Sequence, residues 1–506
     1  MPRLDELRSA LTEASLLPDG AAPPAGAGEA GTGDVAILGL TADSRAVEPG
    51  WLFAALPGTR HDGRDHIAGA VARGAAAVLA PAGTTWPVGV PARPLILATD
   101  ARAALARMAA RFHAAQPEVL VAVTGTNGKT STADFLRQIW GLAGFRAASL
   151  GTLGLVAEGF PPGPSLTTPE PVALHRDLAA LARAGVAHAV IEASSHGLEQ
   201  RRLDGTRLAA AGFSNLTRDH LDYHGGMEGY RAAKLRLFDA LLPAGAPAVA
   251  NADMEAATLV ALRDVAVARG LRLLTVGERG ETIRLLRHEP LPEGQVLEVE
   301  AFGQRATLPL TLPGRYQADN VLMALALAVA TGLELDRVLP LLPSLRTVRG
   351  RMELAARLDN GAAVYVDYAH TPDALERLLA ALRPHVAPGG RLHVVFGAGG
   401  DRDPGKRPLM GAAAAAGADR CWVTDDNPRS EDPATIRRAV LAGCPGGIDA
   451  GDREGAIAAA LDDLRPGDVL AVAGKGHESG QTVGGVTTPF DDVAVVRRLL
   501  GLGVAA

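Results

Sequence analysis

The chain has 506 residues, of which 47% are hydrophobic, and a formal net charge of −6 at pH 7. This length exceeds what one hydrophobic core normally supports, so we expect three domains. The net charge argues against general affinity for nucleic acids. The two cysteines, Cys421 and Cys444, lack metal-type spacing and suggest no disulfide framework, which suits a reducing cytoplasm. The polar N-terminus has no signal-peptide core and no apolar run is long enough for a membrane span, so we expect a cytoplasmic protein that binds no membrane.

The predicted N-terminal domain covers residues 1–103 and is a small α/β unit. Residues 18–34 are rich in Gly, Ala and Pro, and this low-complexity composition predicts a flexible loop without a core. Strand and turn signals resume at Val35. A helix predicted over residues 101–115 then leads into the next domain.

Residues 124–130, Thr-Gly-Thr-Asn-Gly-Lys-Thr, are the most informative stretch of the chain. The apolar run at 119–123 predicts a buried strand before it, and residues 131–140 predict a helix after it. A glycine-rich turn between a strand and a helix cradles phosphates, because backbone N–H groups and the helix N-terminus favour negative charge. We expect Lys129 to reach the terminal phosphates and the Thr130 hydroxyl to bind magnesium. The residues of this predicted nucleotide site are Thr124, Gly125, Thr126, Asn127, Gly128, Lys129 and Thr130.

The central domain, residues 104–345, alternates apolar strands with Ala- and Leu-rich helices, which predicts a mostly parallel sheet covered on both faces. Glu192 follows the predicted strand at 187–191, where a carboxylate is a plausible magnesium ligand or only an aid to helix capping. A second polar cluster is compatible with zinc or a polar loop, but magnesium fits better beside a phosphate loop. Its members are Asp219, His220, Asp222 and His224. Lys234 lies in a helix predicted over residues 230–238 and would ordinarily be a solvated surface lysine.

The C-terminal domain, residues 346–506, has the pattern of a doubly wound α/β fold. Apolar strands are predicted at 363–366, 392–396, 421–424 and 469–473. Each is followed by a turn rich in Gly, Asp or Pro, and helices lie between them. Ligands in such sheets bind beyond the carboxyl ends of the strands, and the polar clusters of this domain occur at those ends.

Together these motifs resemble the Mur ligases, which join a carboxylate to an amine at the expense of ATP. The matching segments are 124–130, 192–198, 215–224, 230–238, 314–320, 349–353, 367–372, 399–408, 425–429 and 474–478. The resemblance implies an α/β protein of three domains: a small N-terminal UDP-binding domain, a central P-loop ATPase domain and a C-terminal Rossmann-like domain. It also implies a monomer that works on small molecules.

The resemblance implies roles by position. Asn320, Arg351 and Asp367 would contact ATP. Two magnesium ions would be held by Thr130, Glu192, His220 and Lys234, with Lys234 carbamylated. Lys129, Lys234 and His220 would be catalytic. The UDP-muramoyl substrate would be bound by Ser44, Thr167, Thr168, Ser194, Gln200 and Arg202.

The implied reaction adds meso-diaminopimelate to the D-glutamate of UDP-MurNAc-L-Ala-D-Glu through an acyl phosphate, in the synthesis of peptidoglycan precursors. Diaminopimelate differs from L-lysine by a carboxylate at its far end, and an arginine fork such as that of Arg429 pairs with a carboxylate bidentately. The residues implied in binding diaminopimelate are Arg402, Asp426, Asn427, Pro428, Arg429, Gly474 and Glu478.

The alternatives within this class are ligation of L-lysine, or another Mur or folylpolyglutamate-type ligase. A P-loop regulatory protein would instead be expected to have a full-length Walker loop and no second substrate-binding domain. A structural protein that had kept the fold and lost activity would be expected to have lost Lys129, Glu192 or Lys234, and the sequence retains all three.

Overall fold

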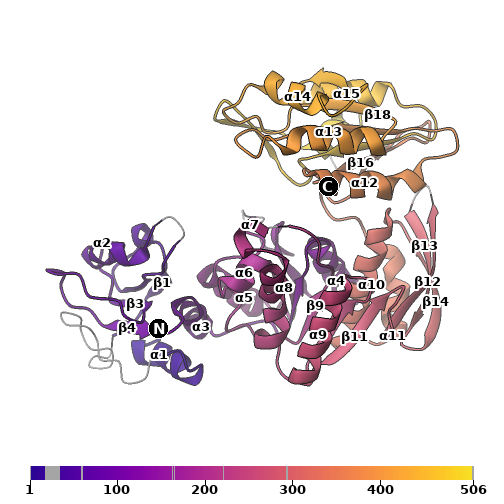
Figure 1. The fold of residues 1–506 in the computed structure, drawn as a ribbon. Helices are drawn as coiled ribbons and strands as arrows, with labels where there is room; N and C mark the ends of the chain where they lie inside the picture. The colour runs from indigo at the N-terminus through magenta and orange to yellow at the C-terminus, as the bar shows by residue number, and fades with distance from the viewer. Residues whose placement is uncertain are drawn as a thin grey trace. The chain divides into compact units, whose positions relative to one another are not determined.

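A computed structural model of the chain describes residues 2–17, 35–58, 61–161, 163, 166–219, 221–291 and 294–503 (Figure 1). The expected loop at 18–34 lies outside these residues. The chain forms two compact units, Met1–Thr275 with Ala326–Leu333, and Val276–Leu325 with Glu334–Ala506. Among the described residues, no helix has both the length and the apolar character needed to cross a membrane. The division into domains at 103 and 345 stays a prediction.

The first unit begins with a four-stranded parallel sheet of order β1-β2-β3-β4. Helix α3 packs on this sheet through Leu105 and Met108, which share a core with Leu79 and Ile96. The elements are α1 (Leu4–Glu13), β1 (Gly39–Thr41), η1 (Ser44–Ala46), β2 (Trp51–Ala54), η2 (Gly63–His66), α2 (Ile67–Ala72), β3 (Ala77–Pro81), β4 (Leu95–Ala98) and α3 (Ala101–His113).

The remainder of the first unit is built on a sheet of order β11-β10-β9-β5-β8-β6-β7, in which β9, β5, β8 and β6 run parallel. Helix α4 packs on β5, β6 and β8. The elements are β5 (Val119–Thr124), α4 (Lys129–Leu142), β6 (Ala147–Gly151), β7 (Gly154–Ala157), α5 (Pro171–Arg183), β8 (His188–Glu192), α6 (Ser195–Glu199), β9 (Ala210–Phe213), α7 (Leu221–His224), α8 (Met227–Arg236), the π-helix η3 (Leu237–Leu241), β10 (Pro247–Asn251), α9 (Ala256–Arg269) and β11 (Arg272–Gly277).

The second unit contains a three-stranded antiparallel meander and a six-stranded sheet of order β15-β16-β20-β17-β18-β19. The chain crosses between the units within β11 and within α10. The elements are β12 (Ile283–Leu291), β13 (Gly294–Ala301), β14 (Gln304–Leu310), α10 (Arg315–Ala330), α11 (Leu335–Val338), η4 (Leu339–Ser344), β15 (Glu353–Arg357), β16 (Ala363–Asp367), α12 (Pro372–Leu382), η5 (Arg383–His385), β17 (Leu392–Phe396), α13 (Lys406–Gly417), β18 (Arg420–Thr424), α14 (Pro433–Leu441), β19 (Ile448–Gly451), α15 (Arg453–Asp462), β20 (Val469–Ala473), β21 (Gly480–Val483), β22 (Val486–Pro489) and α16 (Asp492–Leu499).

The meander β12–β14 differs from the strand–helix alternation predicted for the central part of the chain. Its strands follow one another through short connections and pair antiparallel. Buried and partly buried residues alternate along β13, as in a sheet with one face on the core. A mostly parallel sheet allows such antiparallel strands, and the period-two burial pattern of residues 294–301 marks where they occur.

The six-stranded sheet is buried on both faces, as the doubly wound prediction requires. Alternate residues of one strand join different cores: Leu392, Val394 and Phe396 pack in the cluster that includes α12 and α13, whereas Val395 packs with α15 and α16. Strands that are apolar on both faces appear in the sequence as continuous hydrophobic runs. This explains why β20, and β17 with His393 as its one polar residue, were predicted with the bounds that the structure has.

A buried ion pair joins α15 to α16 and offers a test of the C-terminal packing. Arg453 donates from Nε to Asp492 Oδ1 and from Nη2 to Asp492 Oδ2, both at 2.7 Å, and both side chains are 0% exposed. We expect Arg453→Met to lower the local free energy of unfolding by about 3–5 kcal/mol, because it leaves a buried carboxylate unpaired. Hydrogen exchange of α15 and α16 measures this opening free energy.

The control for this prediction is Arg498→Met. Arg498 pairs with Glu454 at 2.8 Å, and these side chains are 59% and 45% exposed, so its loss should change little. The double variant Arg453→Met/Asp492→Leu should recover most of the lost stability, because no charge is then left buried. Equal effects of Arg453→Met and Arg498→Met would contradict the proposed energetic role of the buried pair.

Candidate active site

The predicted phosphate loop lies at the carboxyl end of β5, between β8 and β9. Gly125 has φ +146°, and a Cβ added there would lie 1.9 Å from Ser214 Oγ, so a side chain is excluded. Gly128 has φ +83° and caps α4, whose N-terminus therefore opens directly at the loop. The predicted strand–turn–helix is confirmed, with the helix beginning at Lys129 rather than at Ser131.

The segment that follows β9 holds the loop in place. Asn215 accepts a hydrogen bond from Thr126 N at its backbone O (2.9 Å) and one from Asn127 N at its Oδ1 (3.0 Å). Ser214 Oγ donates to Asn127 O at 2.6 Å. The loop is thus anchored by residues about 90 positions further along the chain. These bonds fix the shape of the loop and occupy the N–H groups of Thr126 and Asn127, so anion binding falls to the N-terminus of α4.

Two lysines converge on one carbonyl oxygen of the loop. Lys129 Nζ donates to Gly125 O at 2.9 Å, and Lys234 Nζ donates to the same oxygen at 2.7 Å. Lys129 Nζ also donates to Thr126 O at 2.9 Å. Two ammonium groups sharing an acceptor repel each other, and the pair is less costly when one amine is neutral.

Lys234 is the lysine whose surroundings favour the neutral amine. It is 1% exposed, and its Nζ lies 4.5 Å from the centre of the Tyr230 ring. Burial lowers the pKa of Lys234 well below its usual value and the charge of Lys129 lowers it further, while Asp219 opposes the shift. Lys234 is therefore not the solvated surface lysine that its sequence context would ordinarily indicate, because α8 directs this side chain to the phosphate loop.

Glu192 ends β8 with its side chain 2% exposed and reaches the first turn of α4. Its Oε2 accepts from Thr130 Oγ1 at 2.9 Å, and its Oε1 accepts from Thr152 N at 2.8 Å. The register places Glu192 beside Val123 of β5. A Cβ added at Gly151 would lie 2.0 Å from Glu192 Oε1, so glycine makes room for the carboxylate. A buried carboxylate beside a hydroxyl at the phosphate loop provides the hard oxygen donors that Mg²⁺ prefers.

The residues expected to bind the UDP-muramoyl substrate form a connected group at the carboxyl end of β8, apart from Ser44. Thr168 Oγ1 donates to Glu192 O at 2.7 Å and lies 2.9 Å from Ser194 Oγ, and Thr167 Oγ1 lies 3.1 Å from Thr152 Oγ1. Ser194 accepts from Gly197 N and caps α6.

Two further residues of this set, Gln200 and Arg202, lie in the same group. Arg202 Nη1 donates to Thr168 O and its Nη2 donates to Gln200 Oε1, both at 2.7 Å. Ser44 begins η1 in the N-terminal sheet region, where it is partly exposed.

His220, expected as a metal ligand and catalytic residue, lies outside the described residues, so its role stays a prediction. The neighbouring Asp219 is described, and its charge acts on Lys234. His224 Nδ1 lies 2.7 Å from Glu199 Oε2, which links α7 to α6.

The residues expected to contact the nucleotide in the second unit are partly or fully buried and interact with nearby groups. Asn320 Nδ2 donates to Gln317 Oε1 at 2.9 Å, and the Arg351 guanidinium lies 4.8 Å from the centre of the Tyr368 ring. Asp367 accepts from Met352 N and Ala369 N, each at 2.8 Å. Burial raises the pKa of the Asp367 carboxyl, against the opposing effect of Arg351.

The residues expected to bind diaminopimelate gather at the carboxyl ends of β17, β18 and β20. Arg429 has φ +53°, and the hairpin β21–β22 holds its backbone, since Arg429 N donates to Thr482 O at 3.0 Å and Gly484 N donates to Arg429 O at 2.6 Å. Arg429 Nη1 donates to Gly400 O at 2.7 Å. A Cβ added at Gly399 would lie 2.9 Å from Arg429 Nη1 and 3.8 Å from Arg402 Cγ, so both arginines border this glycine.

The acidic part of this group lies around Gly474. Asn427 Nδ2 donates to Glu478 Oε2 at 2.9 Å. Asp426 is 6% exposed, and its Oδ1 accepts no hydrogen bond from the described residues. A Cβ added at Gly474 would lie 3.3 Å from Asp426 Oδ2, and Gly474 has φ +120°. The structure therefore brings Asp426, Asn427, Gly474 and Glu478 together, and their role in binding diaminopimelate stays a prediction. Pro428 is buried next to Arg429.

Sequence reasoning assigned no role to three residues of these groups, Thr152, Tyr230 and Lys475. Thr152 binds Glu192 through its N–H, and Tyr230 OH lies 3.2 Å from Thr126 Oγ1 in the phosphate loop. Lys475 is 0% exposed and donates to Asn427 Oδ1 and Glu478 Oε2. The signal for Lys475 was present in the composition, because the chain has only four lysines.

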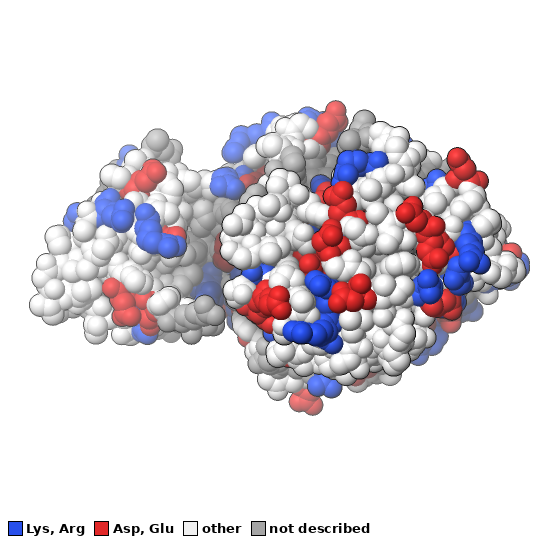
Figure 2. All heavy atoms as spheres, turned by 90° about the horizontal axis from the view of Figure 1, so that it is seen from above, with Lys and Arg blue, Asp and Glu red and all other residues white. Residues whose placement is uncertain are grey.

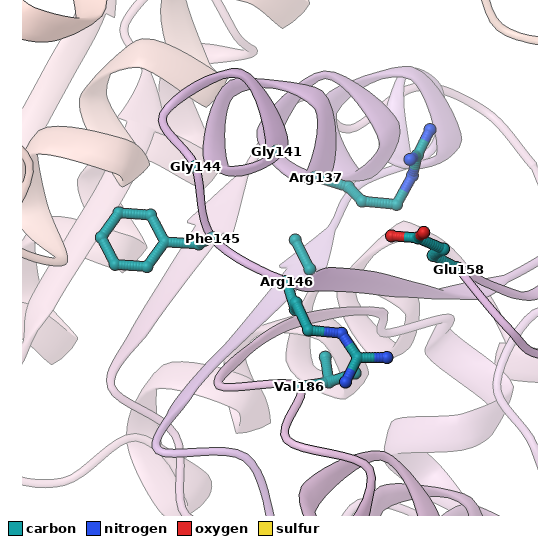
Figure 3. Close-up of a pocket in the computed structure, with 8 residues that line it drawn as sticks. Arg137, Gly141, Gly144, Phe145, Arg146, Glu158 and Val186 are labelled. Carbon is teal, nitrogen blue, oxygen red and sulfur yellow. The ribbon is translucent and has the colours of Figure 1, made fainter.

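A cavity of about 330 Å³ lies away from these residues, at the end of α4 and the amino end of β6 (Figure 3). Arg137, Arg146 and Glu158 point into it, and Phe145 and Val186 lie at its wall. The arginines have protein partners: Arg137 pairs with Asp134 at 2.7 Å, and Arg146 donates to Ala184 O. This cavity is at the opposite edge of the sheet from the phosphate loop, where parallel sheets rarely bind substrates.

The distribution of charged side chains bears on whether the surface can bind a polyanion. Figure 2 shows Lys and Arg interspersed with Asp and Glu over the face that it presents. Among the described residues, that face offers no extended basic surface to a polyanion.

Three domain models of one family match most of the chain. They are the Mur ligase family catalytic domain at residues 36–113, the Mur ligase middle domain at 123–328, and the Mur ligase glutamate ligase domain at 350–476. The glycine-rich phosphate loop falls in the middle domain. The residues around Arg429 fall in the glutamate ligase domain.

Two curated relatives are similar over nearly their whole length. Both are named UDP-N-acetylmuramoyl-L-alanyl-D-glutamate--2,6-diaminopimelate ligase. The protein from Caulobacter vibrioides is 56% identical over 91% of this chain and 95% of its own length. The one from Chelativorans sp. is 52% identical over 92% of this chain and 95% of its own.

Solved structures agree with this. A structure of a UDP-N-acetylmuramoyl-L-alanyl-D-glutamate--2,6-diaminopimelate ligase has a TM-score of 0.68 and 34% identity, covering 92% of this chain and 95% of its own. The MurF ligase from Thermotoga maritima, solved in complex with ADP, shares the fold at TM-score 0.59 and 20% identity, over 92% of this chain and 97% of its own. The chain belongs to the Mur ligase family of ATP-dependent carboxylate–amine ligases, with three α/β domains and mostly parallel sheets.

Proposed function

We propose that this ligase adds meso-diaminopimelate to the D-glutamate of UDP-MurNAc-L-Ala-D-Glu, with ATP converted to ADP and phosphate. The names of the two relatives at 56% and 52% identity support this substrate pair. The choice of amino acid is supported by the placement of Arg429. Its backbone is left-handed, and its guanidinium lies beside Gly399 and Gly400. The reaction serves peptidoglycan precursor synthesis in the cytoplasm, where ATP is available.

The proposed chemistry has two steps. The glutamate carboxylate attacks the γ-phosphate of ATP, forming an acyl phosphate and ADP. The amine of diaminopimelate then attacks the acyl carbon, the C–O bond to phosphate breaks, and the amine loses a proton. Both reactants of the first step are anions, so positive charge near the phosphates must offset their repulsion.

The first unit provides this charge through Lys129, at the loop that the helix α4 follows. Its Nζ lies 2.9 Å from the Gly125 and Thr126 carbonyls, next to the N-terminus of α4, whose N–H groups would bind phosphate. Thr130 and Glu192 would hold Mg²⁺, together with His220 and a carbamylated Lys234. When bound, Mg²⁺ neutralises charge on the phosphates. The close contact of Thr130 Oγ1 with the buried Glu192 carboxylate supports this choice of ligands.

At the other end of the reaction, Arg402 and Arg429 would bind the far carboxylate of diaminopimelate. Asp426 and Glu478 would accept its far ammonium, with Asn427, Pro428 and Gly474 shaping the site. L-Lysine has the ammonium but lacks the carboxylate, so it would leave Arg429 unpaired and place two cations close together. This arrangement favours diaminopimelate over L-lysine, which remains the alternative amino acid.

We expect Arg429→Ala to lower kcat/KM for meso-diaminopimelate by about a hundredfold or more, because a guanidinium that pairs with a carboxylate is lost. The preference over L-lysine should shrink at the same time. Phosphate release with UDP-MurNAc-L-Ala-D-Glu, ATP and each amino acid measures both effects.

Arg438→Ala is the matched control. Arg438 is an exposed arginine of α14 that donates to Thr435 Oγ1. Its loss should leave kcat/KM for meso-diaminopimelate and the preference over L-lysine unchanged. Equal use of L-lysine and meso-diaminopimelate by the wild-type enzyme would refute the specificity assignment and leave the ligase assignment intact. Phosphate release without any dependence on the UDP-muramoyl substrate would refute the proposed reaction.

A further inference from the structure

Lysine is rare in this chain, and its distribution is informative. Of the 50 Lys and Arg residues only four are lysines, Lys129, Lys234, Lys406 and Lys475. Arginine therefore carries nearly all positive charge. A position that still has lysine is a candidate for a place where a compact, tetrahedral ammonium is needed and a planar guanidinium is unsuitable. The proposed function uses Lys129 and Lys234. Lys406 is only partly buried and donates to His370 O at 3.2 Å.

Lys475 is the most buried of the four lysines and lies within the proposed amino-acid site. It is the second residue after β20, and its side chain is 0% exposed. Its Nζ lies 3.1 Å from Asn427 Oδ1, 3.3 Å from Glu478 Oε2 and 3.8 Å from Asp426 Oδ1. These three oxygens belong to two segments, the turn after β18 and the turn after β20. The ammonium joins the two segments through its hydrogen bonds to Asn427 and Glu478, whereas Asp426 Oδ1 lies beyond hydrogen-bond distance.

Lys475 also sets the direction of the Asn427 amide. Asn427 Oδ1 accepts from Lys475 Nζ and, at 3.0 Å, from Thr482 N, which leaves the Nδ2 group facing Glu478 Oε2 at 2.9 Å. The Asn427 carbonyl is thus occupied by two protein donors. The ligand-binding capacity of this cluster rests on its carboxylates, and Asp426 Oδ1 accepts no hydrogen bond from the described residues.

The charges of the cluster match a singly charged cation. Asp426 is 6% exposed and the Glu478 side chain is 35% exposed, and these two acidic groups face the single basic group of Lys475. The three side chains therefore have one acidic group in excess, and its buried part lies at Asp426. The far ammonium of diaminopimelate is a cation of the right size, and it reaches the site together with a carboxylate for Arg429.

We propose that Lys475 is a positioning residue for the amino-acid substrate: it holds Asn427 and Glu478 in the arrangement in which Asp426 and Glu478 accept the substrate ammonium. This inference rests on the proposed function of the Arg429 site and extends it to a residue that does not touch the substrate. Removing the Lys475 ammonium frees the Asn427 amide to rotate and leaves two carboxylates without their shared cation.

The test compares Lys475→Met with Lys475→Arg. We expect Lys475→Met to raise KM for meso-diaminopimelate by about 10- to 100-fold, because two charge-assisted hydrogen bonds are lost. KM for ATP and for UDP-MurNAc-L-Ala-D-Glu should not change. Acyl phosphate formation, followed by positional isotope exchange in ATP without amino acid, should also persist. Lys475→Arg should raise the same KM less, since it keeps the charge and loses the geometry. If Lys475→Met does not fold, the KM of Lys475→Arg for meso-diaminopimelate alone tests the positioning role.

Arg420→Met is the control for loss of a cation from the same domain. Arg420 lies at the other end of β18 and pairs with Asp463 at 3.1 Å, with its side chain 40% exposed. Loss of the Arg420 guanidinium should leave the KM values for meso-diaminopimelate, ATP and UDP-MurNAc-L-Ala-D-Glu unchanged. A purely structural role for Lys475 would lower isotope exchange and the kcat for every substrate together, and this result would overturn the inference.

Comparison with Arg429→Ala separates failure of this inference from failure of the proposed function. Suppose that Arg429→Ala weakens diaminopimelate use and that the Lys475 variants have an unchanged KM for meso-diaminopimelate. The positioning role of Lys475 is then wrong, and the assignment of the amino-acid site is unaffected. If neither variant affects diaminopimelate use, the amino-acid site itself is misplaced, and the inference falls with it. If both raise the KM for diaminopimelate alone, the positioning role is supported.

Discussion

Lys129→Ala is expected to reduce ligation by about a thousandfold or more. The side chain places its ammonium within the phosphate loop, 2.9 Å from two of its carbonyls. Lys234, the other lysine at the loop, is driven towards the neutral amine by burial. Of the two lysines at the loop, Lys129 is therefore the one that can offset the charge that develops when phosphate is transferred to a carboxylate. Removing one such group costs several kcal/mol, at about 1.4 kcal/mol for each factor of ten in rate.

The measurement is phosphate release with saturating substrates, together with positional isotope exchange for the first step alone. Both should fall, because Lys129 acts before the amino acid enters. Arg137→Ala is the control, since Arg137 lies two turns further along α4 and pairs with Asp134 at 2.7 Å, away from the loop. Turnover of Lys129→Ala close to that of the wild type, in a protein with an unchanged circular dichroism spectrum, would show that the ATP site is elsewhere.

Lys234→Ala should lose most of the activity, and the wild-type lysine should carry a carbamate. The amine is 1% exposed and shares the Gly125 carbonyl with Lys129, and both features favour the neutral form. A neutral amine attacks carbon dioxide, forming a C–N bond with loss of a proton, and the product is an anion. This reverses the charge of the side chain and turns a repulsive neighbour of Lys129 into an attractive one.

Carbon-13 NMR under labelled carbon dioxide tests this directly. With four lysines in the chain, a carbamate signal that disappears in Lys234→Ala is assigned without ambiguity. Acetate or another small carboxylate should restore part of the activity of that variant. Fully active wild-type protein without a carbamate signal would contradict the modification. A Lys234→Ala variant with normal kcat would contradict the need for any anion at this position.

The sequence alone determined the elements whose signals are local. Residues 119–130 contain an apolar strand, two glycines in the turn and a lysine at the helix start, and each is recognisable from its neighbours. The strands β17 and β20 were predicted because both faces of the sheet are covered and the runs are apolar, with His393 in β17 as the exception. The order of the motifs was sufficient to indicate the family. It also indicated which residues to seek at the carboxyl ends of the strands.

Only the tertiary structure decided which of these residues act on one another. Thr130 and Glu192 are 62 positions apart, Gly125 and Lys234 are 109 apart, and Asn427 and Lys475 are 48 apart. Parallel strands bring residues that are distant in the sequence to the same end of a sheet. No local sequence pattern predicts the order of the strands in that sheet. The burial of Lys234 and Lys475 has the same origin. From the sequence, a lysine beside a polar motif looks like a surface residue. Only the packing of other segments around it lowers the pKa of Lys234 and buries Lys475 between two turns.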